Sequence, residues 1–328
     1  MSEMLAPIHI ALIPAAALVL VLAFGPLAIR LLKRGGAGQR VRDDGPQRHL
    51  EKAGTPTMGG LLLLGAAVVV ALAAHWWTTR TISLHMVTLL AVLLAFGSIG
   101  AADDWMKITR GRSLGLRARH KLLLQLLVAV LFIYALAGES AVAAALGEAP
   151  DAQPLHPAWA AFWALALVAT SNAVNLADGL DGLAAGICAI GAAGFAVLAL
   201  KAADRETATV ALALTGACIG FLAYNRHPAK VFMGDVGSLA LGGALAAMAA
   251  RLHQPLALIG LCFIPFIEEL SVIVQVISFK TTGRRVLRMS PLHHHFELSG
   301  WSERRVVLTF WLAGIVAAAA AVAASLFA

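Results

Sequence analysis

Residues 157–200 read PAWAAFWALALVATSNAVNLADGLDGLAAGICAIGAAGFAVLAL. Two apolar runs flank a short polar segment, residues 172–182, which carries two aspartates, two asparagines and no basic residue. A helix of about 20 apolar residues crosses the hydrocarbon core of a bilayer, so each run predicts a transmembrane helix. The polar segment between them then lies at one membrane surface, where Asp178 and Asp181 need partners from elsewhere in the chain.

The composition of the whole chain agrees with a membrane protein. Of the 328 residues, 60% are hydrophobic and 13% are charged, against about 45–50% and about 25% in soluble domains. Three cysteines, Cys188, Cys218 and Cys262, lie within apolar segments and are interpreted as small buried hydrophobes, not as a disulfide or metal framework. The first apolar run has no basic region before it, so it is expected to remain as the first membrane helix of a single polytopic domain over residues 1–328.

Apolar segments of this kind recur along the whole chain. We therefore expect an all-α integral membrane protein with about ten transmembrane helices. The expected spans are residues 8–32, 58–77, 84–102, 120–137, 157–175, 183–200, 207–224, 236–251, 256–279 and 306–328.

The distribution of basic residues orients these spans. Most of the 25 lysines and arginines fall in alternate loops, and short cytoplasmic loops are enriched in such residues. Both termini are therefore expected outside the cytoplasm. The net charge of +7 is then mainly a signal of topology, and nucleic-acid binding is not expected. The loops expected in the cytoplasm are residues 33–57, 103–119, 176–182, 225–235 and 280–305.

Five aspartates occur at or just past the predicted cytoplasmic helix ends, in three different loops. A helix cap or a solvated loop acid would account for any one of them, since aspartate favours such positions. Five together at one interface indicate a Mg²⁺ site, because this cation binds carboxylates, water and substrate phosphates. The five are Asp103, Asp104, Asp178, Asp181 and Asp235.

Basic residues and histidines on the same face suggest binding of an anionic substrate. Lys52, Lys107, Lys121 and residues 284–288 (RRVLR) would hold a diphosphate or a lipid phosphate, although topology and contacts with anionic membrane lipids also account for cytoplasmic basic residues. The histidine run at 293–295 is too closely spaced for one tetrahedral zinc ion. Phosphate or sugar contacts, with proton transfer near neutral pH, are preferred for it.

Glu268 and Glu269 differ from the other acids because they fall near the middle of the ninth expected span. A charged carboxylate is costly there, so both should face the protein interior. A structural hydrogen-bonding role and a functional role are both open, and acids inside a membrane also occur in cation transporters. Against a transporter, most acids gather at one face instead of following a path through the bilayer.

Five motifs, in order along nearly the whole chain, resemble the phospho-N-acetylmuramoyl-pentapeptide-transferase family. They are TPTMGG (55–60), ADDWMK (102–107), NLADGLDGLAAG (175–186), FMGDVGSLALGG (232–243) and SPLHHHFELSGW (290–301). The resemblance implies an enzyme of the bacterial cytoplasmic membrane with periplasmic termini, an active-site cleft at the cytoplasmic face, and a homodimer. It would need Mg²⁺ and would transfer phospho-N-acetylmuramoyl-pentapeptide from its UDP carrier to undecaprenyl phosphate, releasing UMP.

The resemblance also implies roles for individual residues. Asp235 would hold the metal, and Asp103, which could act as a base or as a nucleophile, would be catalytic together with Asp104, Asp235 and His293. Positions that match the family's substrate-binding residues are Lys52, Lys107, Lys121, Asn175, Asp178, Asp181, Asn225, Phe232, Gly234, His294 and His295. Glu269 departs from the expected pattern, which puts only local packing in doubt.

A related enzyme that transfers N-acetylglucosamine 1-phosphate to a polyprenyl phosphate would share the aspartate motifs and the fold. The segment at 290–301 distinguishes the two, because SPLHHHFELSGW is similar to the muramoyl-pentapeptide type.

Overall fold

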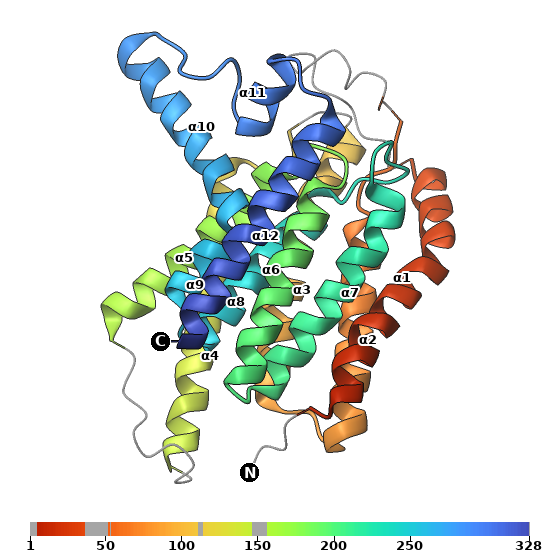
Figure 1. The fold of residues 1–328 in the computed structure, drawn as a ribbon, viewed down its shortest axis with the longest axis vertical. Helices are drawn as coiled ribbons and strands as arrows, with labels where there is room; N and C mark the ends of the chain where they lie inside the picture. The colour runs from red at the N-terminus through yellow and green to blue at the C-terminus, as the bar shows by residue number, and fades with distance from the viewer. Residues whose placement is uncertain (1–4, 37–51, 53, 111–113, 146–155, 328) are drawn as a thin grey trace.

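The computed structural model describes residues 5–36, 52, 54–110, 114–145 and 156–327, and within these ranges the regular secondary structure is helical. Figure 1 shows the helices as a bundle, with α10 and α11 at one end. The helices are α1 (Pro7–Arg34), α2 (Gly60–Thr79), α3 (Leu84–Arg110), α4 (Ala118–Ala145), α5 (Pro157–Ala177), α6 (Leu183–Lys201), α7 (Arg205–Asn225), α8 (Gly234–Arg251), α9 (Pro255–Leu261), α10 (Phe263–Thr282), α11 (Leu292–Leu298) and α12 (Glu303–Phe327).

The all-helical, multi-pass membrane fold expected from the sequence is confirmed. Eight described helices are long and apolar enough to cross a membrane, and α9 with α10 forms a ninth candidate that is bent by 82°. The span expected at 256–279 is therefore broken between Leu261 and Phe263. The span expected at 236–251 corresponds to α8, which is not among these candidates. The count of ten and the periplasmic position of the termini therefore stay predictions.

Helix α8 lies at the centre of the bundle. Every residue from Val236 to Ala250 is buried, and α8 packs most extensively on α3 and α5. Its sequence is rich in glycine and alanine, which lets neighbouring helices approach closely where lipid supplies no hydrophobic driving force. At Gly100 of α3 the approach leaves no room for a side chain, because a Cβ there would overlap the backbone carbonyl of Asp235. This contact fixes the end of α3 against the start of α8.

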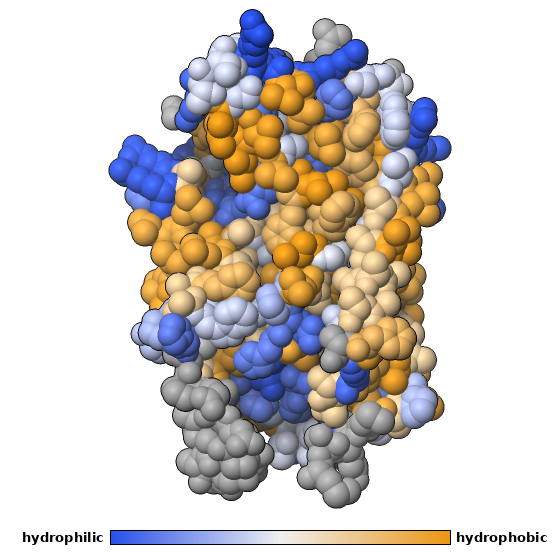
Figure 2. Space-filling view, turned by 60° about the vertical axis from the view of Figure 1, so that its left-hand side comes forward, coloured by the Kyte–Doolittle hydropathy of each residue, from blue (hydrophilic) through white to orange (hydrophobic). Residues whose placement is uncertain are grey.

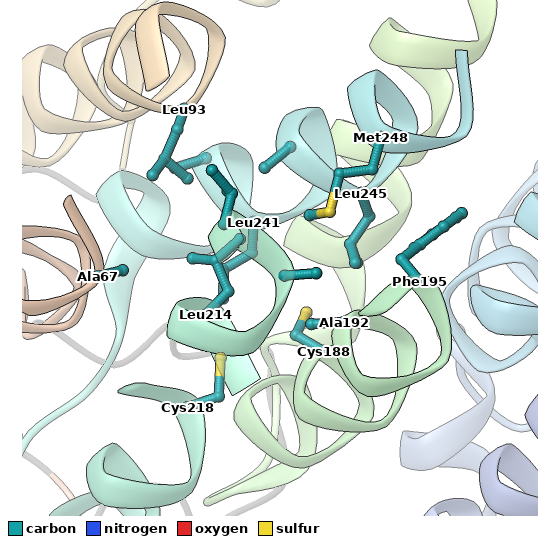
Figure 3. Close-up of a cluster of buried hydrophobic side chains, with 14 of the residues drawn as sticks. Ala67, Leu93, Cys188, Ala192, Phe195, Leu214, Cys218, Leu241, Leu245 and Met248 are labelled. Carbon is teal, nitrogen blue, oxygen red and sulfur yellow. The ribbon is translucent and has the colours of Figure 1, made fainter. Parts of the chain in front are cut away.

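The core between these helices is apolar and includes the cysteines. Cys188, Cys218 and Cys262 are free and buried, which confirms the interpretation of their role. Figure 3 shows side chains of α2, α3, α6, α7 and α8 meeting in one such cluster. The labelled residues are Ala67, Leu93, Cys188, Ala192, Phe195, Leu214, Cys218, Leu241, Leu245 and Met248.

The outer surface is that of a protein in a bilayer. Large apolar side chains such as Val19, Leu123 and Ile277 are more than half exposed, which is stable only against an apolar solvent. On the face shown in Figure 2, hydrophobic residues cover most of the middle, and hydrophilic residues gather at the upper end and in patches near the lower end.

Described residues of all five segments expected at the cytoplasmic face meet at one end of the bundle. Contacts join Lys52 to Asp181 and Glu303, and Lys107 and Lys121 to Asp235. Helix α1 begins and α12 ends in the lower half of Figure 1, away from α11.

Two expectations about this end were wrong. Residues 103–119 were expected as a loop, but α3 continues to Arg110, so Asp103, Asp104 and Lys107 lie on helical turns. Helix α11, which contains the histidine run, was not expected as a helix. Charged and polar residues interrupt the apolar pattern in both segments, so the sequence did not predict a helix there. Packing on neighbouring elements stabilises both helices.

We predict that Gly100→Ala destabilises the protein by about 1–3 kcal/mol, the usual cost of overpacking a tight contact. Thermal unfolding of the purified protein measures this change. The matched control is Gly65→Ala in α2, where a Cβ would meet nothing within 4 Å. Since alanine favours a helix more than glycine does, the control should be neutral or slightly stabilising. Equal unfolding temperatures for the two variants would contradict the tight packing of α3 on α8.

Candidate active site

The first group of functional side chains lies where α3 ends and α8 begins. Asp103 and Asp104 occupy the last turns of α3, and Asp235 is in the first turn of α8. One oxygen from each carboxylate lies within 4.8 Å of the others. Asp103 and Asp104 are almost fully buried. Three carboxylates at this spacing need cations, because like charges in a partly dry environment repel one another strongly.

Two lysines supply positive charge to this group. Lys107 Nζ lies 2.6 Å from Asp103 Oδ2 and 3.1 Å from Asp235 Oδ2. It is also 3.5 Å from Asp104 Oδ1. Lys121, in the first turns of α4, donates to Asp235 Oδ2 at 2.6 Å. Lys107 reaches two acids of its own helix because residues three and four apart share a helix face.

Backbone groups fix the orientation of the α3 carboxylates. The N–H of Leu116 donates to Asp103 Oδ1 at 2.8 Å, and the N–H of Val236 donates to Asp104 Oδ2 at 3.2 Å. Gly234 precedes Asp235 with φ +75°, and a Cβ there would strike Asp104 Oδ2 and Thr57 Oγ1. A left-handed backbone and the lack of space both require glycine at this position. This accounts for the glycine in the FMGDVGS motif.

Two residues of segment 175–182 (NLADGLDG), called the aspartate loop below, complete this first group. Asn175 Nδ2 donates to Asp235 Oδ1 at 3.0 Å and to Ser238 Oγ at 2.8 Å. Asp178 accepts a hydrogen bond from the backbone of Gly234. Burial raises the pKa of the Asp178 carboxyl well above its usual value of 3.8, and the Asp235 carboxylate raises it further.

A second, separate cluster contains Lys52 and Asp181. Lys52 Nζ donates to Asp181 Oδ1 and to Glu303 Oε1, both at 2.7 Å. His227 Nδ1 lies 3.2 Å from Asp181 Oδ2 and 3.2 Å from Glu303 Oε2. The partners of Asp181 are therefore Lys52 and His227. The contacts of Lys107 and Lys121 are with the first group.

The two clusters differ in their donor atoms, and this decides which one suits a hard metal ion. The first supplies three carboxylates, from Asp103, Asp104 and Asp235. The second supplies two carboxylates and the imidazole of His227, and the ammonium of Lys52 already lies between both carboxylates. A hard divalent cation prefers an oxygen-rich site with residual negative charge. The first cluster therefore fits Mg²⁺ better.

The residues that match nucleotide-binding positions border both clusters. Asn225 is buried, accepts from the N–H of Gly182 and donates to the carbonyl of Val231. Phe232 is partly exposed, and its backbone pairs with Pro56 and Gly59. Asn225 thus ties the aspartate loop to Val231, and the partly exposed Phe232 follows directly in the chain.

The three histidines have different surroundings. His293 is 1% exposed and its Nε2 packs against Gly179, so a Cβ at that glycine would overlap the ring. His294 Nδ1 lies 2.8 Å from Glu297 Oε2. His295 Nδ1 accepts from the N–H of Arg288. His293 thus contacts the aspartate loop, and all three histidines contact protein groups.

Glu268 is linked to the histidine run. It is fully buried, and its Oε1 accepts from the backbone N–H of His293 at 3.2 Å. His293 Nδ1 lies 3.2 Å from the same oxygen, an ion-pair distance, although the alignment does not make a hydrogen bond. The contact supports a structural hydrogen-bonding role for this glutamate.

The basic segment 284–288 packs on its neighbours. Gln275 Oε1 accepts from the N–H groups of Val286 and Leu287. Arg285 lies over the ring of Phe279, and Arg288 donates to the carbonyl of Leu298. These contacts hold the segment to α10 and α11.

Sequence patterns did not single out Glu303 or His227. Glu303 follows the last motif by two residues and lies in the first turn of α12. An acid just before an apolar run is typical of a helix start, and that was its one signal in the sequence. A pocket lined by Lys201, Leu252, Gln254 and other residues lies near the opposite end of the bundle. Its lining residues include no carboxylate. The cytoplasmic cleft stays a prediction.

Two models of known protein families match parts of this chain. Residues 85–253 match the model described as "Glycosyl transferase family 4". Residues 52–64 match "Phospho-N-acetylmuramoyl-pentapeptide-transferase signature 1". The first match contains the aspartates of both clusters, and the second begins at Lys52.

Curated relatives with that same name cover nearly the whole chain. The relative from Desulforudis audaxviator is 49% identical over 313 residues, which are 92% of this chain and 94% of the relative. The relative from Geobacillus kaustophilus is 48% identical over 308 residues, 92% and 93% of the two chains. The relative from Oceanobacillus iheyensis is 44% identical over 302 residues, with the same coverage. All three are named phospho-N-acetylmuramoyl-pentapeptide-transferase.

We predict that Asp178→Asn stabilises the metal-free protein near neutral pH. An acid whose pKa is raised by folding binds more protons in the folded state, so folding stability falls as the pH rises above 3.8. Asparagine removes this loss and still accepts from the Gly234 N–H. Thermal unfolding should show a higher midpoint than the parent at neutral pH, by a few degrees if the gain is about 1 kcal/mol. The gain should shrink as the pH approaches 4, and a pH-independent difference would contradict the prediction.

Proposed function

The chain belongs to the phospho-N-acetylmuramoyl-pentapeptide-transferase family, and we propose that the clustered end of its bundle carries out the reaction of that family. In this reaction the phospho-N-acetylmuramoyl-pentapeptide moves from its UDP carrier to undecaprenyl phosphate. The products are undecaprenyl-diphospho-N-acetylmuramoyl-pentapeptide, known as lipid I, and UMP, in peptidoglycan synthesis. The cellular site would be the bacterial cytoplasmic membrane, where both the lipid acceptor and the nucleotide donor are accessible.

The observation that carries this proposal is the group of Asp103, Asp104, Asp235, Lys107 and Lys121 at the end of a membrane bundle. The reaction brings the phosphate of a lipid onto the diphosphate of a nucleotide, so two anions must meet. Neutralising and aligning them supplies most of the catalysis. A position at the helix ends lets one substrate approach from the bilayer and the other from water.

The donor set of the first cluster fits Mg²⁺, with Asp235 as the ligand we assign and Asp103 and Asp104 beside it. When bound, Mg²⁺ would stabilise the charge that develops on the diphosphate as UMP leaves. Lys121 and Lys107 hold Asp235 through its Oδ2, and Asn175 holds Oδ1. Asp235 is therefore oriented by three side chains before any ligand arrives.

The remaining site residues are proposed to bind substrate. Phe232 offers a partly exposed ring that would stack on uracil. The other substrate-binding positions carried over from the family resemblance are Lys52, Lys107, Lys121, Asn175, Asp178, Asp181, Asn225, Gly234, His294 and His295. His293 is proposed as catalytic by the same resemblance. A homodimer is proposed on the resemblance alone.

A second candidate function is transfer of N-acetylglucosamine 1-phosphate to a polyprenyl phosphate. The aspartates and lysines of the first cluster suit either donor, because both reactions break the same type of diphosphate. The muramoyl-pentapeptide donor is favoured by the relatives' shared name and by the SPLHHHFELSGW motif, which contains helix α11.

We predict that the purified protein with UDP-N-acetylmuramoyl-pentapeptide, undecaprenyl phosphate and Mg²⁺ releases UMP, and that removing Mg²⁺ with a chelator stops the reaction reversibly. Asp235→Ala should lower kcat by about 100-fold or more, the scale of losing one preorganised charge-stabilising group. Thermal unfolding checks that the variant is folded. Turnover by the variant at the parent rate would remove Asp235 from the metal site, and a preference for UDP-N-acetylglucosamine in a donor competition would favour the second candidate.

We also predict direct displacement at phosphorus, with inversion in a chirally labelled donor. Both oxygens of Asp103 are engaged, Oδ1 by the Leu116 N–H and Oδ2 by Lys107. A carboxylate whose negative charge is neutralised in this way is a poor nucleophile. Much of the phosphate acceptor is already dianionic at neutral pH, since its second pKa is about 6, so a base adds little. Trapping a phosphoryl group on Asp103, or retention at phosphorus, would instead establish a two-step reaction.

A further inference from the structure

We propose that Glu303 is a positioning residue that holds Lys52 and Asp181 in place for the UDP-linked donor. This inference rests on the proposed function, because it assigns Lys52 and Asp181 to substrate binding. Glu303 begins α12, follows the last sequence motif, and belongs to none of the five motifs.

The carboxylate of Glu303 binds three groups from three other segments. Its Oε1 accepts from Lys52 Nζ and from the backbone N–H of Asp181, each at 2.7 Å. Its Oε2 lies 3.2 Å from His227 Nδ1. Charge-assisted hydrogen bonds of this length are the stronger kind found in proteins. One side chain therefore joins α12 to the segment before α2, to the aspartate loop and to the segment after α7.

Asp181 and Glu303 share the same two partners. Lys52 Nζ lies 2.7 Å from an oxygen of each, and His227 Nδ1 lies 3.2 Å from an oxygen of each. Asp181 Oδ2 also accepts from the N–H of Ala229. Loss of either carboxylate leaves Lys52 with one anionic partner instead of two, and the ammonium is then free to move.

The position of the cluster points to the donor substrate and not to the chemical step. Asn225 connects the aspartate loop at Gly182 with Val231, and Ala229 and His227 belong to the same segment. This segment leads to Phe232, the proposed uracil partner. The contacts of Lys107 and Lys121 are with the separate group around Asp235. A disturbance at Glu303 should therefore weaken donor binding while the catalytic aspartates keep their geometry.

Glu303 lies in the first turn of α12, where the helix dipole favours a carboxylate. The Lys52 side chain is only 16% exposed, which limits the screening of these ion pairs by water.

The experiment compares Glu303→Gln with the parent in steady-state assays that vary one substrate at a time. Glutamine keeps an acceptor for the Asp181 N–H but removes the charge opposite Lys52. The KM for UDP-N-acetylmuramoyl-pentapeptide should rise about tenfold, as expected for weakening one hydrogen bond to a charged group. The kcat and the KM for undecaprenyl phosphate should stay within about twofold. A purely structural role would lower the amount of active enzyme without this selective change in one KM.

Glu206→Gln is the matched control. Glu206 is also a glutamate in the first turn of a helix, α7, at the opposite end of the bundle. Both substitutions remove the same charge from a helix start, so thermal unfolding of Glu206→Gln measures the part of the stability cost that comes from the helix dipole alone. Only Glu303→Gln should change the KM for the donor.

A double-mutant cycle tests the path through Lys52. In a Lys52→Gln background there is no ammonium to hold, so adding Glu303→Gln should change the donor KM by less than twofold. Full additivity of the two effects overturns the inference, as does a Glu303→Gln variant whose kinetics match those of Glu206→Gln. Absence of turnover by the parent protein is a different result, because it contradicts the proposed function itself.

Discussion

The bridge that Lys107 makes between Asp103, Asp104 and Asp235 is the interaction on which the site depends. Three carboxylates from two helices would otherwise push the end of α3 away from the start of α8. The ammonium lies within 3.5 Å of all three, and it sits on the same helix as two of them. Since removing one partner from a buried charge cluster costs far more than the cluster contributes as a whole, the lysine and the aspartates are best understood as one unit.

Packing of small residues makes this bridge geometrically possible. A lysine and a carboxylate on two helices meet at 3.1 Å only because Gly100 lets the α3 backbone touch the carbonyl of Asp235. Gly234 then turns the chain so that Asp235 enters α8 beside Asp104. The glycines of the motifs are therefore part of the electrostatics, because they set the distances at which the charges act.

The sequence predicted the helices well and predicted the pairing of charges poorly. Span positions follow from runs of apolar residues, a local signal. The predicted boundaries lie within a few residues of the observed helices except where α3 continues past Asp103 and where α4, expected to end at residue 137, continues to Ala145. The bend between α9 and α10 and the short helix α11 depend on packing between distant segments, which no local pattern contains. The same holds for Lys52, whose partners Asp181 and Glu303 lie 129 and 251 residues away. Motifs identified most of the residues in the site but not which ones touch.

The division into two clusters gives the lysines different roles. Lys107 and Lys121 contact three carboxylates, so some negative charge remains to bind a cation. The two lysines and that cation can then face a diphosphate together. Lys52 faces two carboxylates and a histidine, and binding to a substrate anion would compete with both of those ion pairs. A lysine held in this way contributes mainly by fixing the aspartate loop, since a cation already neutralised attracts a further anion only weakly. The substrate-binding role of Lys52 is thus better explained by the order it imposes on Asp181 and the neighbouring backbone than by direct attraction of phosphate.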